Sequence, residues 1–243
     1  TVTDGSGNTA TATQVVTVTD NVNPTITAPS AVSTTTNTGC TATGVSLGSP
    51  STGDNCSVAS ITNNAPSSFP VGNTTVTWTV TDGSGNTATA TQTVTVTDNV
   101  APTASCQNIT VNLDATGNAT ITAAQINNGS SDNCGVASVT ISNTSFNCSN
   151  VGANTVTLTV TDANGNTAAC NATVTVVDNI APSALCQNVT VNLSPAGTAS
   201  ITAAQINNGS NDNCGIATVT VSPSSFTCAN VGNNTVTLTV TDV

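Results

Sequence analysis

The strongest constraint on this chain is an internal repeat with a period of about 80 residues. The segment at residues 79–102 reads TVTDGSGNTATATQTVTVTDNVAP. It recurs as TVTDGSGNTATATQVVTVTDNVNP at 1–24 and as TVTDANGNTAACNATVTVVDNIAP at 159–182. One folding unit, repeated along the chain, therefore has to account for nearly the whole sequence.

Each copy of this segment predicts two β-strands joined by a tight turn. Val76, Trp78 and Val80 alternate with threonines, so that one face is apolar and the other carries hydroxyl groups. That period of two is typical of a half-buried strand. Residues 82–86 supply turn-forming Asp, Gly, Ser and Asn, and Pro102 ends the second strand because proline cannot extend a central ladder.

The period divides the chain into units that we number as repeats. Residues 1–20 are expected to be the C-terminal end of a preceding repeat. Repeat 3 is expected to lack its last strand, so that the chain samples one continuous array. The linkers between units contain proline and predict a semi-rigid rod. The repeats are repeat 1 (21–99), repeat 2 (100–179) and repeat 3 (180–243).

Turn signals at short intervals predict an all-β fold of tandem immunoglobulin-like β-sandwiches. Trp78 is expected in the core, with a sugar-stacking platform as the alternative, and one phenylalanine per repeat is expected in the core as well. These phenylalanines are Phe69, Phe146 and Phe226. The strands expected in repeat 2 are 108–113, 119–126, 136–142, 154–161 and 167–177.

Composition argues against several classes of function. The chain has no Lys, Arg or His, and its net charge of −11 comes from aspartate alone. Nucleic acids and anionic membranes are bound through Lys and Arg, so neither is an expected partner. No apolar run is long enough to insert in a membrane. The usual general acids and bases, His, Glu, Lys and Tyr, are absent, so we do not expect an enzyme, and no cofactor is required.

The motifs D-x-x-G-N … V-x-V-x-D-N-x-x-P, with D-N-C in the middle of each unit, resemble the hyalin repeat (HYR), an immunoglobulin-like extracellular module. The version rich in Thr and Asn and free of Lys is similar to repeats of very large bacterial surface adhesins. The resemblance implies a non-catalytic spacer or adhesive stalk located outside the cell, at its surface, with neighbouring repeats of the same chain or filament as partners.

Nine cysteines in small units indicate disulfides and an oxidising compartment. Zinc is the competing interpretation, but the chain lacks His and CxxC motifs. We expect the long pair to join the first and last strands of repeat 2, and Cys186 to have no mate in this chain. The expected pairs are Cys40–Cys56, Cys106–Cys170, Cys134–Cys148 and Cys214–Cys228.

Aspartates recur at three places in each unit: the entering linker, the loop before the third strand and the final turn. In an immunoglobulin-like sandwich these places converge at one end, where three carboxylates repel each other. Calcium accepts such oxygen ligands, and Asn99, Asn133 and Asn166 are further candidates. The alternative is that these residues only form turns. The predicted calcium ligands are Asp20, Asp54 and Asp82; Asp98, Asp132 and Asp162; and Asp178, Asp212 and Asp242.

Two classes of function remain. The first is a structural segment of a long extracellular stalk or filament. The second is a binding module that holds a glycan, a protein or ice through its Thr-rich strand faces, although the aromatic and Arg anchors of most binding surfaces are missing outside the expected core. A separate alternative concerns assembly: residues 8–19 of one molecule could complete the open sandwich of the next.

Overall fold

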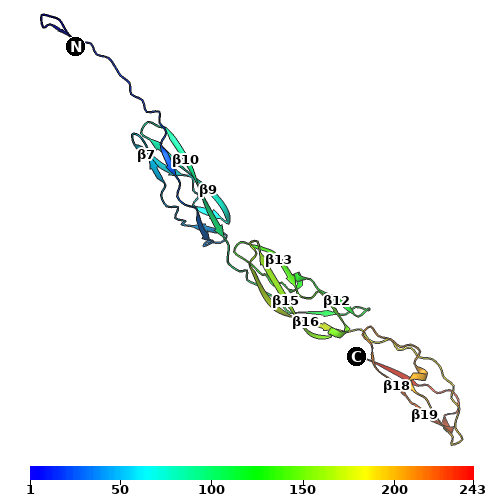
Figure 1. The fold of residues 1–243 in the computed structure, drawn as a ribbon. Coiled ribbons are helices and arrows are strands. Elements are labelled where there is room, and N and C mark those ends of the chain that lie inside the picture. The colour runs from blue at the N-terminus through cyan, green and yellow to red at the C-terminus, as the bar shows by residue number, and fades with distance from the viewer. The chain divides into compact units, whose positions relative to one another are not determined.

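The computed structural model describes residues 1–243, and it is almost entirely β-structure (Figure 1). The chain forms two compact units, Thr1–Asn99 and Val100–Val243. Each complete sandwich contains a four-stranded sheet in which the first strand runs parallel to the last, as in immunoglobulin-like folds. The predicted all-β, immunoglobulin-like class is therefore confirmed. Both α-helices are single turns of four residues, and neither could cross a bilayer.

The first unit is built around a long hairpin whose two strands each contain 11 residues. This hairpin pairs with two further strands in the sheet order β4-β10-β9-β7, and β4 is parallel to β10. The short pairs β3-β6 and β5-β8 form the rest of the sandwich. The strands are β1 (Val2–Thr3), β2 (Thr9–Ala10), β3 (Thr25–Thr27), β4 (Val32–Thr35), β5 (Thr41–Thr43), β6 (Ser51–Gly53), β7 (Val58–Asn63), β8 (Ser68–Pro70), β9 (Gly72–Asp82) and β10 (Thr87–Thr97).

Alternation in β9 places its apolar side chains in the core of repeat 1. Val76 and Val80 are fully buried, and Trp78 is 6% exposed. The Trp78 indole N–H donates to Oε1 of Gln92 at 3.0 Å. The Gln92 amide in turn donates to the carbonyls of Ser30 and Leu47, so every polar group in this part of the core has a partner. Trp78 is thus a core residue and not an exposed sugar platform.

Repeat 2 has the same architecture, with the sheet order β11-β16-β15-β13 and a separate pair β12-β14. The predicted strand at 119–126 is wrong in its second half, which forms a single helical turn. Thr122 and Gln125 make a capping box there, and the Ala-Ala-Gln-Ile sequence favours helix. The elements are β11 (Ile109–Asn112), β12 (Asn118–Thr120), α1 (Ala123–Ile126), β13 (Val136–Ile141), β14 (Ser145–Asn147), the 3-10 turn η1 (Cys148–Asn150), β15 (Gly152–Asp162) and β16 (Thr167–Val177).

Repeat 3 contains only two short sheets, β17-β19 and β18-β20, and no strand occupies the place that β16 holds in repeat 2. Its core is correspondingly more open. Phe226 is half-buried, whereas Phe146 of repeat 2 is 3% exposed. The elements are β17 (Thr198–Ser200), α2 (Ala203–Ile206), β18 (Ile216–Ser222), β19 (Ser225–Thr227), the 3-10 turn η2 (Cys228–Asn230) and β20 (Thr237–Asp242).

The N-terminal residues lie outside any sandwich. β1 and β2 form a hairpin of two residue pairs, and residues 11–19 have no regular structure. Every side chain from residue 1 to residue 19 is exposed, and Val15 and Val18 are each 90% exposed. This segment therefore has the sequence of a core strand but no sheet of its own.

Candidate metal centre

Asp20, Asp54 and Asp82 lie together at one end of repeat 1. One carboxylate oxygen of each lies within 4.8 Å of the others. The three residues come from the linker that enters the repeat, the loop before β7 and the turn between β9 and β10. These three positions were predicted to converge, and in the structure they lie together.

The turn between β9 and β10 fixes the position of Asp82. Its Oδ1 accepts from the backbone N–H groups of Ser84 and Asn86, and its Oδ2 accepts from the Asn86 amide at 2.7 Å. The same Asn86 amide donates to the carbonyls of Asp20 and Val22 in the entering linker. Asn86 therefore ties the final turn to the linker and holds two of the three carboxylates in register.

Two oxygens of this cluster are buried without a hydrogen-bond partner. Asp20 uses Oδ1 to accept from the Val22 N–H and the Asn55 amide, whereas its Oδ2 has no donor. Asp54 uses Oδ2 to accept from the N–H groups of Cys56 and Ser57, and its Oδ1 has no donor. A buried carboxylate oxygen without a donor is costly, so both atoms are suited to bind a hard cation.

A second cluster of the same kind consists of Asp178, Asp212 and Asp242. Asp178 Oδ2 and Asp212 Oδ1 are again buried without a donor, as is the side-chain oxygen of Asn213. The Asn213 amide donates to Asp178 Oδ1 at 3.1 Å, as Asn55 does to Asp20 in repeat 1. With no Lys, Arg or His in the chain, neither cluster can be neutralised by a cationic side chain.

Hydrogen bonds lower the pKa of two carboxylates in the first cluster, those of Asp20 and Asp82. The pKa of Asp20 is lowered by the Val22 N–H and then by the Asn55 amide. Burial alone would raise the pKa of Asp82, but donation from Asn86 and the turn amides outweighs it, so this pKa is lowered as well. The pKa of the neighbouring Cys56 thiol is raised, because it donates to Asp20 and lies beside its negative charge. Asp20 and Asp82 are thus anionic and available to a cation at neutral pH.

The remaining predicted ligands are divided between the two compact units. Asp98 belongs to the first unit and is 7% exposed, while Asp132 and Asp162 belong to the second. Asp162 accepts from Asn166 and two turn amides, in the pattern of Asp82, and its pKa is likewise lowered by these bonds against the effect of burial. Asp132 Oδ1 is buried without a donor. Calcium at this third group, with Asn99 and Asn133 as neighbours, stays a prediction.

The disulfides differ from the predicted pattern. Cys106, which precedes β11, is joined to Cys170 in β16, so this expected pair is present. Cys148, however, is joined to Cys214 across the boundary between repeat 2 and repeat 3, which replaces the expected Cys134–Cys148 and Cys214–Cys228 pairs. Cys40 and Cys134 are disulfide-bonded. The expected Cys40–Cys56 pair is also absent, since the free cysteines are Cys56, Cys186 and Cys228.

The junction around the Cys148–Cys214 bond is tightly packed. Asn213 donates to the carbonyl of Asp114 in repeat 2, in addition to Asp178. Gly117 has φ = +74°, and a Cβ there would lie 2.6 Å from Cys148 Sγ and 2.9 Å from the Asn213 carbonyl oxygen. The sequence contains one signal for this close contact, a glycine at the same place in repeats 2 and 3. The contact was not predicted from it.

Comparisons with known proteins give one family match and several distant structural matches. The family model of the HYR domain matches residues 19–96. The structural matches include protocadherin gammaB7 EC3-6, at 18% identity over 72% of this chain and 55% of that chain, with a TM-score of 0.35. A second is Drosophila N-cadherin EC1-4, at 12% identity over 64% of this chain and 50% of that chain, with a TM-score of 0.37. A third is human mucin-like protocadherin EC1-2, at 13% identity over 64% of this chain and 98% of that chain, with a TM-score of 0.38.

These cadherin structures are too distant to transfer a function, and the chain covers about half the length of two of them. No curated protein matches the chain. The HYR match, in contrast, covers one full period of the repeat, and it supports an extracellular, adhesion-related repeat domain. Residues 19–96 therefore match the HYR domain, and they fold as an immunoglobulin-like β-sandwich.

Proposed function

We propose that this chain is a structural segment of a long extracellular stalk or filament, of the kind found in bacterial surface adhesins. The segment consists of successive HYR-type repeats at residues 21–99, 100–179 and 180–243. The function of such a segment is reach and stiffness, without catalysis. The residue set supports this, because the chain has no His, Lys or Arg and all its acidic residues are aspartate.

The observation that carries the proposal is the Cys148–Cys214 disulfide between consecutive repeats. A domain that acts alone needs its staples inside its own core, as Cys106–Cys170 is. A bond from one repeat to the next adds nothing to a binding face or a reaction site. It restricts movement at the junction, which is what a stiff stalk requires.

We propose further that calcium occupies the acidic clusters. Each cluster offers three carboxylates within 4.8 Å and two buried oxygens without donors. Calcium binds six to eight such oxygens in flexible geometry. Because Asp20 and Asp178 come from the linkers, a bound ion would join each linker to the repeat that follows and stiffen the chain there.

Calorimetric titration with calcium, followed by melting curves in calcium and in chelator, tests this part of the proposal. Calcium at about 100 times its Kd should add about 2.7 kcal/mol to the free energy of unfolding of the repeat that binds it. The double variant Asp54→Asn and Asp212→Asn removes one buried oxygen donor from each cluster and should abolish most of the effect. Asp114→Asn, outside both clusters, is the matched control. Identical melting curves with calcium and with chelator would refute the calcium sites but leave the stalk function standing.

The structural role is tested by stiffness. Small-angle scattering of the whole chain should show a narrow range of conformations, and the double variant Cys148→Ser and Cys214→Ser should broaden it. If both proteins scatter identically, the disulfide does not stiffen the junction. The competing binding function predicts a signal on glycan arrays or thermal hysteresis in ice, and a structural segment should give neither.

A further inference from the structure

The second acidic cluster lies next to the disulfide that joins repeats 2 and 3. Asp212 of this cluster belongs to residues 212–214, which we call the junction loop. The last residue of the loop, Cys214, is bonded to Cys148 of repeat 2. A predicted calcium ligand and a covalent bond to the preceding repeat are therefore two residues apart in sequence.

The junction loop sets the orientation of the Asp212 carboxylate through Cys214. The backbone N–H of Cys214 donates to Asp212 Oδ2 at 2.8 Å. The other oxygen of this carboxylate, Oδ1, is buried without a donor. Because Oδ2 is held by the residue that carries the disulfide, the place of Oδ1 depends on the place of Cys214. Whatever fixes Cys214 therefore also fixes a predicted calcium ligand.

Asn213 connects the cluster to repeat 2 a second time. Its amide donates to Asp178 Oδ1 at 3.1 Å and to the backbone carbonyl of Asp114 in repeat 2 at 3.3 Å. Its side-chain oxygen is buried without a donor. Amide oxygens are suitable calcium ligands, so Asn213 adds a fourth side chain to the three carboxylates. The junction loop thus carries two candidate ligands, and both are held by contacts with repeat 2.

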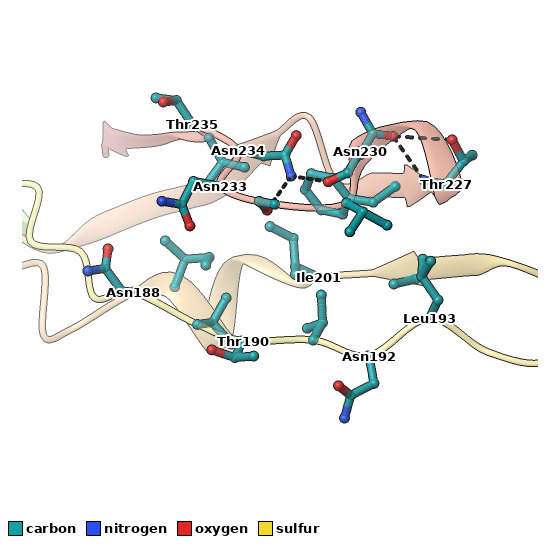
Figure 2. Close-up of a pocket in the computed structure, with 18 of the residues that line it drawn as sticks. Asn188, Thr190, Asn192, Leu193, Ile201, Thr227, Asn230, Asn233, Asn234 and Thr235 are labelled. Carbon is teal, nitrogen blue, oxygen red and sulfur yellow. Dashed lines mark hydrogen bonds between the residues drawn. The ribbon is translucent and has the colours of Figure 1, made fainter.

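The other end of the disulfide lies in a well-fixed turn. Cys148 is the first residue of η1, and this turn is closed by the backbone N–H of Asn147, which donates to Asn150 Oδ1 at 2.9 Å. Figure 2 shows the equivalent closure in repeat 3, where Thr227 donates to Asn230. The closed turn is therefore a property of the repeat, and the disulfide ties the junction loop to a fixed point of repeat 2.

A hollow of about 210 Å³ borders Asp212 and Asn213. Ala115 of repeat 2 lines it, together with Ile180 and Ser183 of repeat 3. Calcium takes six to eight oxygen ligands, and the hollow has room for the waters that would complete this number. A calcium ion at the second cluster would therefore lie where the two repeats meet.

We propose that the Cys148–Cys214 disulfide regulates calcium binding at the second cluster. With the bond intact, the junction loop holds Asp212 and Asn213 ready for the ion. With the bond reduced, the ion itself has to order the loop, and this cost lowers its affinity. The inference rests on the calcium sites of the proposed function, and it adds their control by the redox state of the surroundings.

Coupling of this kind is reciprocal. If the disulfide raises the affinity for calcium, bound calcium opposes reduction of the disulfide by the same factor. Couplings between two sites are commonly about 5-fold to 150-fold, so we expect at least about a fivefold change in calcium affinity. For a two-electron couple, a fivefold change corresponds to a shift of about 20 mV in the reduction potential.

Reduction of the bond requires an electron donor, and a dithiol is the chemical class that supplies it. A thiolate of the dithiol attacks one sulfur of the bond, and its second thiol then resolves the mixed disulfide. The dithiol becomes a disulfide, while Cys148 and Cys214 receive two electrons and two protons. Both cysteines are half-buried, so they are partly accessible to a small dithiol.

The first measurement is calorimetric titration of the full chain with calcium. The changes Asp54→Asn and Asp132→Asn lower binding at the other two groups of aspartates, so the titration reports the second cluster. Adding Cys148→Ser and Cys214→Ser should weaken calcium binding by at least about fivefold. Circular dichroism checks that this variant keeps its β-structure.

The matched control applies the same two serine changes to a chain that carries Asp212→Asn and Asp132→Asn. Here the titration reports the first cluster, which lies in the other compact unit. The Kd for calcium should then be the same with and without the Cys148–Cys214 bond.

The second measurement uses the unmodified chain and needs no variant to fold. The chain is equilibrated with mixtures of reduced and oxidised dithiothreitol, in calcium or in chelator. Thiols are trapped by alkylation and counted by mass spectrometry of Asp-N peptides. Calcium should shift the midpoint of the Cys148–Cys214 bond by about 20 mV or more toward resistance to reduction. The Cys106–Cys170 bond, which does not hold the junction loop, is the internal control and should not shift.

The outcomes separate this inference from the calcium sites on which it rests. Equal calcium affinities with and without the bond would overturn the inference and leave the calcium sites standing, as would an unshifted Cys148–Cys214 midpoint in a chain that binds calcium. An equal change at the first cluster or in the Cys106–Cys170 midpoint would also overturn it, because the effect would then be general. A chain that binds no calcium at the second cluster in any state would refute the calcium site itself, and the inference with it.

Discussion

Removing the disulfide between repeats 2 and 3 should separate their unfolding and lower their stability. Cys148 and Cys214 are 66 residues apart in sequence. In the chain-entropy model, closing a loop of this length restricts the unfolded chain by about 4 kcal/mol at room temperature. We therefore expect the double variant Cys148→Ser and Cys214→Ser to lose about 4 kcal/mol of unfolding free energy from the second compact unit.

The assay is guanidinium denaturation followed by circular dichroism, with Trp78 fluorescence as an internal reference. Trp78 is the only tryptophan and lies in the first unit, so its transition should not move. The matched control is Cys56→Ser with Cys228→Ser, which changes the corresponding free thiols and should leave both transitions unchanged.

A loss of unfolding free energy smaller than about 1 kcal/mol in the second unit would refute this prediction, since that is an ordinary effect of a single substitution. An equal shift of the Trp78 transition would refute it as well, because the effect would then not be confined to the unit that holds the bond.

Two further changes test individual contacts. Gln92→Ala should destabilise repeat 1 by about 2–4 kcal/mol, because it leaves the Trp78 N–H and two carbonyls buried without partners. The expected result is a red-shift of Trp78 emission and a lower guanidinium midpoint. An unchanged midpoint would contradict the prediction. Gly117→Ala should destabilise the second unit by about 1–3 kcal/mol through its positive φ and its contact with the Asn213 carbonyl. Gly197 has the same φ as Gly117 but contacts no residue of another repeat. The difference between the guanidinium midpoints of the Gly117→Ala and Gly197→Ala variants therefore measures the contact at the junction between repeats 2 and 3.

The sandwich could be predicted because its signals are local. The alternation of Val76, Trp78 and Val80 with threonine places a strand and its buried face directly. The Asp-to-Asn turns mark where each hairpin reverses, which also allowed the convergence of Asp20, Asp54 and Asp82 to be predicted. The helical turn at α1 was missed because four residues are too few to show a helical period against a strand-like neighbourhood.

The disulfide pairing could not be predicted, because in a tandem repeat Cys148 can pair with the cysteine at the same repeat position in its own unit or in the next unit. Cys214 occupies in repeat 3 the position that Cys134 occupies in repeat 2. A rule of short sequence separation selects Cys134, which precedes Cys148 by 148 − 134 = 14 residues, over Cys214, which follows it by 66. Only the spatial arrangement of successive units decides between them, and no local pattern in the sequence encodes it.

The Cys148–Cys214 bond also sets how far the chain can be pulled out. While it is intact, these two residues stay 5.2 Å apart between their Cα atoms when force is applied to the ends of the chain. When it is reduced, the chain between them, which spans a sequence separation of 66, can extend to roughly 220 Å at 3.3–3.6 Å per residue. The redox state of the surroundings would thus convert this segment from an inextensible tether into one that lengthens and dissipates energy under load.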